Sequence, residues 1–137
     1  FPRGRLLLAG SGATLEECKA LAAQLGIGER GKFLGYVEEM ETLYPLCDAA
    51  VSSSRIEGLP FNIMEAMACG LPVIASRIKG HIDLLGEDSP WLYDTQEQLA
   101  QLLGRAGELE FPMDWGAVLG DYLLPVVREE LRKEYLG

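Results

Sequence analysis

Residues 47–76 read CDAAVSSSRIEGLPFNIMEAMACGLPVIAS, and this stretch decides the fold. Small and apolar residues over 47–53 predict a buried strand, after which a loop is expected. Apolar residues from about 61 to 69 predict a helix that a glycine ends, and a second apolar run over 71–76 predicts another buried strand. A strand, a helix and a strand in this order favour two parallel strands joined by a crossover helix.

The same alternation extends along the rest of the chain. Further strands are expected over residues 5–9, 32–37 and 91–93, and helices over 14–25, 40–46, 81–85 and 95–103, with a helical segment over 115–136 that Pro125 breaks. Strands that lack polar alternation predict a Rossmann-like α/β domain, a parallel sheet with helices on both faces.

The first helix carries two more specific expectations. Thr14 and Glu17 have the spacing of a capping box, in which a hydroxyl and a carboxylate satisfy backbone amides at the start of a helix. Apolar residues that recur at helical intervals are expected to face the core: Leu15, Cys18, Leu21, Ala22 and Leu25.

Composition narrows the class of protein. The 137 residues suit one domain, and a hydrophobic content of 48% can form a core without disulfides or metal. The formal charge of −9, from 12 basic and 21 acidic residues, argues against a nucleic-acid-binding surface and is interpreted as a contribution to solubility. A phosphate ligand would therefore have to be held by local backbone amides or by basic groups outside this chain.

The cysteines and termini indicate a protein of the cytosol. Cys18, Cys47 and Cys69 show no CxxC spacing and are expected to be buried free thiols. No apolar run approaches the length of a membrane span, and residues 1–4 lack the apolar core of a signal peptide. Because the first strand follows at once, we expect the chain to be a piece of a longer protein.

Ligands of open parallel sheets bind at the carboxyl ends of the strands, and four loops end there: residues 10–12, 35–37, 52–61 and 76–81. The third loop carries Glu57, with Glu65 eight positions further on inside the predicted helix. Gly58 lets the backbone approach a ligand, and the start of the helix can bind an anion. A carboxylate beside such a site suits sugar and ribose hydroxyls, to which a charged hydrogen bond contributes roughly 1.5–3 kcal/mol.

A purely structural interpretation of the two glutamates also stands. Glu57 would cap the helix, and Glu65 would be an exposed helix residue. The second half of that interpretation is weakened by the neighbours of Glu65, which are all apolar or small: Ile63, Met64, Ala66, Met67 and Ala68. On the residues alone the two interpretations are evenly balanced.

The stretch from Ser52 to Ser76, with its two glutamates followed by AMACGLPVI, resembles the signature of retaining family 4, or group 1, glycosyltransferases of GT-B fold. The resemblance extends to residues 7–12 (LLAGSG), 32–37 (KFLGYV) and 80–84 (GHIDL), so it covers nearly the whole chain. The GLPFNIM variant and the Gly80-His81 pair are most similar to enzymes of bacterial capsule and exopolysaccharide synthesis.

The resemblance implies a role for each matching position. Glu57, the implied catalytic residue, would contact hydroxyls of the transferred sugar, and Glu65 would accept hydrogen bonds from the ribose of the donor. Backbone of Gly58, Leu59, Pro60 and Phe61 would face the diphosphate and sugar, and backbone near Tyr36 and Val37 would face the nucleobase. A UDP-sugar is the expected donor, with GDP- and ADP-sugars as alternatives, and no metal is expected because the charge on the departing diphosphate is stabilised by other groups.

The family pattern also indicates what this chain lacks. Residues 1–137 would form the donor-binding domain without its first strand and helix, which bear an Arg and a Lys that hold the diphosphate, and residues 112–137 would form a C-terminal helical segment packed on it. The N-terminal domain, which binds a glycan or lipid-linked acceptor, would also be absent. We therefore expect the chain alone to be inactive, and the whole enzyme to be cytoplasmic, with the inner face of the membrane as an alternative location.

Three other residues are candidates for ligand contact. Arg55 could reach a phosphate or could be a solvated loop residue; His81 could contact a donor or acceptor, although a structural role is favoured. Gly12 completes half of a dinucleotide-binding fingerprint, but a tight turn explains it better. Two alternative functions stay open: a non-catalytic nucleotide-binding regulatory or subunit domain, and another GT-B relative such as a sugar phosphorylase or nucleotide-sugar epimerase.

Overall fold

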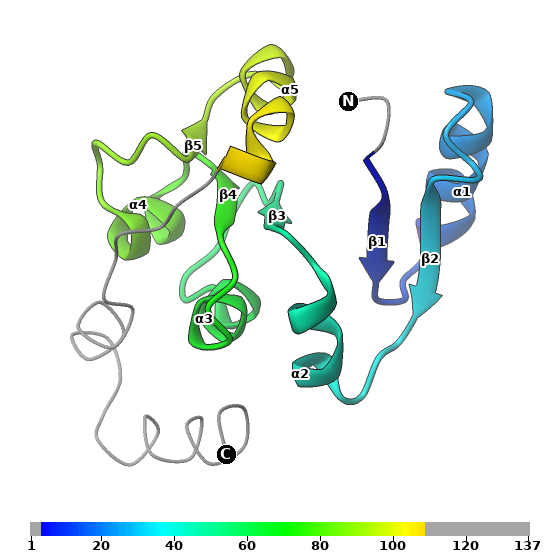
Figure 1. Ribbon diagram of the computed structural model, residues 1–137, viewed down its shortest axis with the longest axis horizontal. Helices are drawn as coiled ribbons and strands as arrows, with labels where there is room; N and C mark the ends of the chain where they lie inside the picture. The colour runs from blue at the N-terminus through cyan, green and yellow to red at the C-terminus, as the bar shows by residue number, and fades with distance from the viewer. Residues whose placement is uncertain (1–3, 109–137) are drawn as a thin grey trace. The chain divides into compact units, whose positions relative to one another are not determined.

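The computed structural model describes residues 4–108, which form two compact units divided after Met40. Figure 1 shows the elements of each unit. Strands and helices alternate in both, and every strand pair is parallel, so the predicted parallel α/β class is confirmed. Each unit contains a parallel sheet of its own, with two strands in the first unit and three in the second. The helical segment predicted over 112–137, with Trp115 and Pro125, lies outside the described residues.

The first unit is a single strand–helix–strand motif. Strand β1 (Leu6–Ala9) and strand β2 (Gly31–Gly35) pair in parallel, and helix α1 (Leu15–Gln24) connects them. Their carboxyl ends are joined, because the amide of Gly10 donates to the carbonyl of Gly35 at 2.6 Å. Both glycines adopt positive φ, +132° at Gly10 and +67° at Gly35, a conformation that most other residues avoid.

Two expectations for α1 are wrong. Thr14 makes no side-chain cap, because its backbone (φ −93°, ψ 5°) lies outside the extended region in which a capping hydroxyl reaches the helix amides. Only Ala22 of the predicted inward face is buried, whereas Leu21 and Leu25 are 53% and 63% exposed. Two strands and one helix offer too little surface to cover a whole apolar helix face.

The second unit opens with short helices and continues as alternating strands and helices. Its elements are α2 (Met40–Leu43, beginning at the junction), a 3₁₀ turn (Tyr44–Leu46), β3 (Ala50–Ser52), α3 (Phe61–Ala68), β4 (Val73–Ser76), α4 (Lys79–Leu85), β5 (Leu92–Tyr93), α5 (Gln96–Gly104) and a last 3₁₀ turn (Ala106–Glu108). The sheet order is β3-β4-β5, with β4 in the centre. Within the described part of this unit, each element predicted from the sequence is present, with bounds that differ by a few residues.

The core of the second unit forms between its central strand and its helices. Val73, Ile74 and Ala75 of β4 are fully buried, as are Met64 and Met67 of α3. Helix α3 packs on β3 and β4, and α4 and α5 pack on β5. In α5, Leu102 joins a cluster with Ile74 and Tyr93 against which Trp91, Leu99 and Leu103 pack, so the apolar side of this helix faces the core. In the short helical region before β3, Tyr44 is buried and Leu46 is 78% exposed.

Candidate functional site

The carboxyl edge of the β3-β4-β5 sheet is polar and hollowed. The loops that follow the three strands enclose an open pocket of about 720 Å³. Its lining is rich in hydroxyls and includes two arginines: Ser53, Ser54, Arg55, Ser76, Arg77, Ile78, Tyr93, Asp94, Thr95, Gln96 and Leu99. This is the edge at which open parallel sheets bind ligands.

Glu57 is held in the loop after β3 by a serine of the same loop. The hydroxyl of Ser54 donates to Oε1 of Glu57 at 2.8 Å. Ser54 also lines the open pocket, which Glu57 and Glu65 do not line. Glu57 is half-buried, and its carboxylate is oriented by a hydrogen bond rather than freely solvated. It does not cap α3, since no side chain caps that helix.

The start of α4 packs against the backbone of the same loop. Gly80 is buried so closely against Glu57 that a Cβ there would overlap the Glu57 carbonyl oxygen and lie 3.1 Å from its carbonyl carbon. The hydroxyl of Ser76, at the end of β4, donates to the carbonyl of Ser54 at 2.6 Å. Two neighbouring segments therefore fix the backbone on which Glu57 stands.

Glu65 lies in the second turn of α3, a helix whose other polar residue, Asn62, is exposed in the first turn. Ile63, Met64, Ala66 and Met67 around it are buried, which confirms that the helix has little polar surface. Glu65 itself is half-buried, and the hydroxyl of the buried Tyr44 donates to its Oε2 at 3.3 Å. The same hydroxyl also donates to the carbonyl oxygen of Asn62 at 3.2 Å, so Tyr44 links the 3₁₀ turn to α3.

The start of α3 is only partly free to bind an anion. No side chain caps it and no acidic residue lies in its first turn, so its partial positive charge is not neutralised there. However, the amides of Phe61 and Ile63 donate to the carbonyls of Leu59 and Pro60, at 3.0 and 3.1 Å. These two amides are therefore already bonded within the tight turn that leads from the loop into the helix.

The loop before α3 offers open space beside its backbone. A Cβ added at Gly58 would meet no heavy atom within 4 Å, and Gly58 does not adopt positive φ. The chain geometry alone thus does not require glycine, whereas close approach of a ligand would. Leu59 and Phe61 are 40% and 56% exposed, and Pro60 between them is buried.

The candidate residues of the first unit share the carboxyl edge of its own sheet. Tyr36 and Val37 follow β2 directly; Tyr36 is 79% exposed and Val37 is half-buried. Gly12 lies in the turn after β1, and its carbonyl accepts from the amide of Leu15 at 3.2 Å. A Cβ at Gly12 would meet no atom within 4 Å, so this turn leaves its backbone accessible.

Arg55 and His81 differ sharply in exposure. Arg55 is exposed and lines the pocket, where its guanidinium can reach a ligand. Arg77, which the sequence did not single out, also lines it but is bonded to the Asp94 carboxylate at 3.1 Å and the Glu87 carbonyl at 2.7 Å. His81 is fully buried, and its ring lies within hydrogen-bonding distance of groups at the ends of β3 and β4, which favours the structural role.

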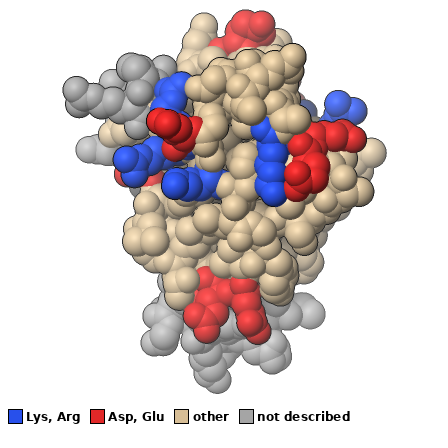
Figure 2. Space-filling view, turned by 90° about the vertical axis from the view of Figure 1, so that its right-hand side faces the viewer, with Lys and Arg blue, Asp and Glu red and all other residues tan. Residues whose placement is uncertain are grey.

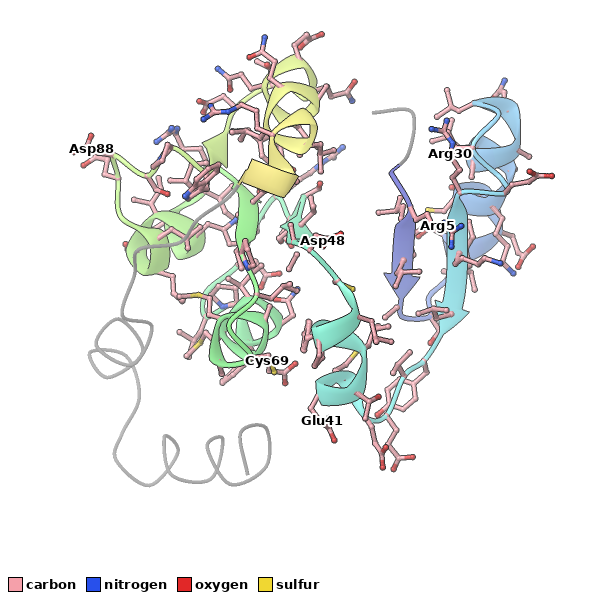
Figure 3. All side chains as sticks on the ribbon, viewed as in Figure 1. Arg5, Arg30, Glu41, Asp48, Cys69 and Asp88 are labelled. Atoms are coloured by element: carbon pink, nitrogen blue, oxygen red, sulfur yellow. The ribbon has the colours of Figure 1, made fainter. Side chains whose placement is uncertain are left out.

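The cysteines are free thiols, as expected, but they are less buried than expected. Cys18 is exposed, and Cys47 and Cys69 are half-buried. Burial raises the pKa of the Cys69 thiol, and the negative charges of Glu65 and Glu41 raise it further. Figure 3 labels Glu41 on α2 and Cys69 at the end of α3. Burial and Asp48 likewise raise the pKa of Cys47, so neither thiol is activated as a nucleophile.

Charge and metal-ligand chemistry add two observations on the described residues. On the face that Figure 2 shows, Lys and Arg side chains lie among Asp and Glu side chains rather than in one basic patch. Residues 4–108 contain no group of three or more His, Cys, Asp or Glu side chains placed to hold a metal ion.

The helices within the same residues are all too short or too polar to span a membrane.

Sequence reasoning found the two glutamates but missed most of the groups that hold them. Tyr44, Ser54, Ser76 and Gly80 contact Glu57, its loop or Glu65, and their roles depend on tertiary packing. One signal was available: three consecutive serines, Ser52 to Ser54, at the end of the strand predicted over 47–53 place several hydroxyls at a ligand-binding edge.

The domain has a hydroxyl-lined hollow at the ends of its parallel strands. It also has two oriented carboxylates, one in the adjoining loop and one in the helix that follows. Both features suit a ligand with many hydroxyl groups. Comparison with known proteins agrees: residues 1–111 match the family described as "Glycosyl transferases group 1". The chain belongs to this family of glycosyltransferases.

Individual relatives carry the same description. The chain is 37% identical over 85 residues to EpsD of Bacillus subtilis, described as a glycosyltransferase, covering 62% of this chain and 22% of that protein. It is 27% identical over 136 residues to the glycosyltransferase MJ1607 of Methanocaldococcus jannaschii, covering 96% of this chain and 33% of that one. The chain thus spans a third or less of the length of these relatives.

Solved structures show the same fold. The lipopolysaccharide outer core galactosyltransferase WaaB, in its apo form, superimposes with a TM-score of 0.73 at 23% identity, over 96% of this chain and 40% of that one. HepE of Anabaena, solved in complex with UDP, superimposes with a TM-score of 0.67 at 22% identity, over 98% of this chain and 38% of that one. The GT-B, Rossmann-like fold inferred from the sequence is therefore confirmed.

Proposed function

We propose that this chain is the donor-binding domain of a retaining hexosyltransferase, inactive alone, that moves a sugar from a nucleotide diphosphate to a bacterial polysaccharide or lipid-linked glycan. The observation that carries the proposal is the oriented carboxylate of Glu57, held at 2.8 Å by Ser54 in the loop between the sheet edge and α3. In this proposal the chain is part of a longer enzyme whose other domain binds the acceptor.

Glu57 is suited to a sugar because both its oxygens can accept hydrogen bonds and one of them is already fixed. Ser54 holds Oε1, so the orientation of the carboxylate is set before a ligand arrives. Preorganisation of this kind reduces the entropy lost on binding. The open space at Gly58 gives a sugar room beside the same backbone.

Glu65 is suited to the ribose of the donor. It is half-buried on α3, eight residues after Glu57, and Tyr44 orients it through Oε2. A carboxylate can accept two neighbouring hydroxyls, as the 2′ and 3′ hydroxyls of a ribose present them. A charged hydrogen bond contributes roughly 1.5–3 kcal/mol, or about 10- to 150-fold in affinity.

The diphosphate would lie against backbone rather than against a dense cluster of basic side chains. The start of α3, without an acidic residue in its first turn, favours negative charge, and the backbone of residues 58–61 leads into it. Arg55 is the nearby basic candidate. Backbone near Tyr36 and Val37 would face the nucleobase, and this part of the proposal rests on the resemblance to the family. Charge on the departing diphosphate is then stabilised without a metal ion.

A UDP-sugar is the proposed donor, with GDP- and ADP-sugars as alternatives. HepE, a relative in fold, was solved with UDP, which makes uridine the first base to test. The acceptor would be a growing exopolysaccharide or capsule glycan. That role corresponds to a cytoplasmic enzyme, including one bound peripherally at the inner face of the membrane.

The decisive experiment separates nucleotide binding from sugar transfer in the intact enzyme. Glu57→Gln should leave the Kd for UDP, measured by calorimetry, within about threefold while turnover of UDP-[¹⁴C]hexose falls by roughly 100-fold or more. Glu65→Gln should weaken UDP binding about 10- to 150-fold. The exposed Glu97→Gln on α5 is the matched control and should change neither quantity.

Each alternative outcome has a distinct meaning. Normal turnover of Glu57→Gln would show that the assigned sugar contact is wrong. Nucleotide binding without transfer from any UDP-, GDP- or ADP-sugar would favour a non-catalytic regulatory domain. Release of a sugar phosphate, or epimerisation of the donor, would identify a phosphorylase or an epimerase instead. Loss of UDP binding in the presence of EDTA would contradict the metal-independent part of the proposal.

A further inference from the structure

A chain of polar side chains, buried at its His81 and Ser52 end, connects α4 to Glu57. The ring of His81, fully buried, lies with Nε2 3.3 Å from the Ser52 hydroxyl. That hydroxyl lies 3.4 Å from the hydroxyl of Ser54, which in turn donates to Oε1 of Glu57 at 2.8 Å. Ser52 is itself only 5% exposed, so solvent does not compete for the first two links.

The other side of the ring is anchored to the sheet. Nδ1 of His81 lies 2.8 Å from the carbonyl oxygen of Ser76 and 3.3 Å from its hydroxyl. A carbonyl oxygen can only accept, so Nδ1 carries the proton. Nε2 of the neutral ring then accepts from Ser52, so the single proton of the Ser52 hydroxyl is shared between Nε2 at 3.3 Å and the Ser54 hydroxyl at 3.4 Å. The ring thus has a fixed tautomer and orientation, because β4 holds one nitrogen and β3 the other.

From this arrangement we propose that His81 is a positioning residue for Glu57, which acts through Ser52 and Ser54 without touching the substrate. The proposal rests on the proposed role of Glu57 in sugar transfer. Nε2 of His81 holds the Ser52 hydroxyl in the rotamer from which it also donates to Ser54. Without that contact Ser52 can turn away from Ser54, which is the side chain that orients the Glu57 carboxylate. A carboxylate that is misplaced by about 1 Å can lower turnover about 100-fold.

The same contacts explain the Gly80-His81 pair. Gly80 allows the start of α4 to lie against the backbone of Glu57, and His81, the next residue, connects that point to both neighbouring strands. Ser76 takes part in two of these contacts. Its carbonyl oxygen accepts from Nδ1 of His81, and its hydroxyl donates to the carbonyl of Ser54. The backbone and the side chain of the Glu57 loop are therefore positioned by one helix start.

Two substitutions at His81 test the contact of each ring nitrogen separately in the intact enzyme. His81→Asn retains a donor near Nδ1 for the Ser76 carbonyl but cannot reach Ser52, whereas His81→Gln can reach Ser52 as Nε2 does. We expect His81→Asn and Ser52→Ala each to lower kcat by about 10- to 100-fold, and the double variant to lower it no further. His81→Gln should restore a substantial part of kcat.

Binding measurements distinguish positioning from general destabilisation. The Kd for UDP should stay within about threefold of the wild-type value in all these variants, because Glu65 and α3 are not part of the chain of contacts. In a Glu57→Ala background, His81→Asn should have no further effect on turnover.

Several results would overturn the inference. They are unchanged kcat in His81→Asn and Ser52→Ala, additive losses in the double variant, or a parallel loss of UDP affinity and kcat. Failure of the proposed function would look different: Glu57→Ala would then retain turnover irrespective of what happens at His81.

Discussion

Replacement of Gly80 by alanine would place one methyl group where no atom fits. The added Cβ would overlap the carbonyl oxygen of Glu57 and lie 3.1 Å from its carbonyl carbon and 3.2 Å from its Cβ. One side of this contact must move. The start of α4 is held by the buried ring of His81, whereas Ile56 in the Glu57 loop is 90% exposed. We therefore expect the loop to give way.

The magnitude follows from the size of the overlap. Relief of the contact requires a displacement of the order of 1 Å, which costs about 1–3 kcal/mol of stability in a packed region. A displacement of that size at a residue that contacts substrate lowers turnover about 100-fold. Binding of UDP, assigned here to Glu65 and the start of α3, should change by less than about threefold.

The assay compares two alanine variants of the intact enzyme. Gly104→Ala is the matched control, since a Cβ at Gly104 meets nothing within 4 Å and its φ is not positive. It should leave turnover unchanged and alter the free energy of unfolding by less than about 1 kcal/mol. Donor turnover, the Kd for UDP and the unfolding midpoint in urea are measured for both. Wild-type turnover in a folded Gly80→Ala enzyme would refute the reasoning that α4 positions Glu57.

Three further predictions concern the neighbouring contacts. Tyr44→Phe should weaken UDP binding about three- to tenfold, measured by calorimetry, because Glu65 loses the hydroxyl that orients it; unchanged affinity would contradict this. Thr95→Ala should lower the free energy of unfolding in urea by about 0.5–2 kcal/mol, because Thr95 forms a complete capping box, whereas Thr14→Ala, which removes no cap, should not. Glu65→Gln should lower the raised pKa of Cys69 and so increase its rate of alkylation at about pH 8, followed by mass spectrometry; an unchanged rate would show that the carboxylate does not act on this thiol.

Much of the fold could be predicted because its signals are local. Apolar runs without polar alternation identified every strand, and the helix over residues 61–69 was expected within one residue of α3. Which strands pair with each other, and how deeply each side chain is buried, depend on contacts between residues far apart in the sequence. Leu21 and Leu25 have helical spacing, but the spacing does not reveal how much surface is available to cover them.

The two threonines illustrate the same limit at the scale of one turn. Thr14 and Thr95 each precede a helix and have a Glu or Gln three residues later. Only Thr95 adopts the extended backbone (φ −128°, ψ 159°) from which its hydroxyl reaches the helix amides. The backbone conformation before the helix, which the preceding turn decides, is not encoded in the spacing.

For the candidate site, sequence reasoning identified charged residues but not their supports. Glu57 and Glu65 stand out because carboxylates are costly among apolar neighbours. Ser52 does not stand out, since serine is common in loops, and Gly80 stood out only through the family resemblance, which did not indicate its contact with Glu57. Their importance appears only when β3 and its loop meet β4 and α4, through contacts between residues 22 and 29 apart in the sequence.

The shortness of the outer strands in the three-stranded sheet has a consequence for handling the protein. β3 contributes three residues and β5 only two, so each border exposes few backbone groups that another molecule could extend. Very short border strands are a common protection against strand-to-strand aggregation. Within the second unit, these short strands should therefore limit fibril formation in concentrated samples.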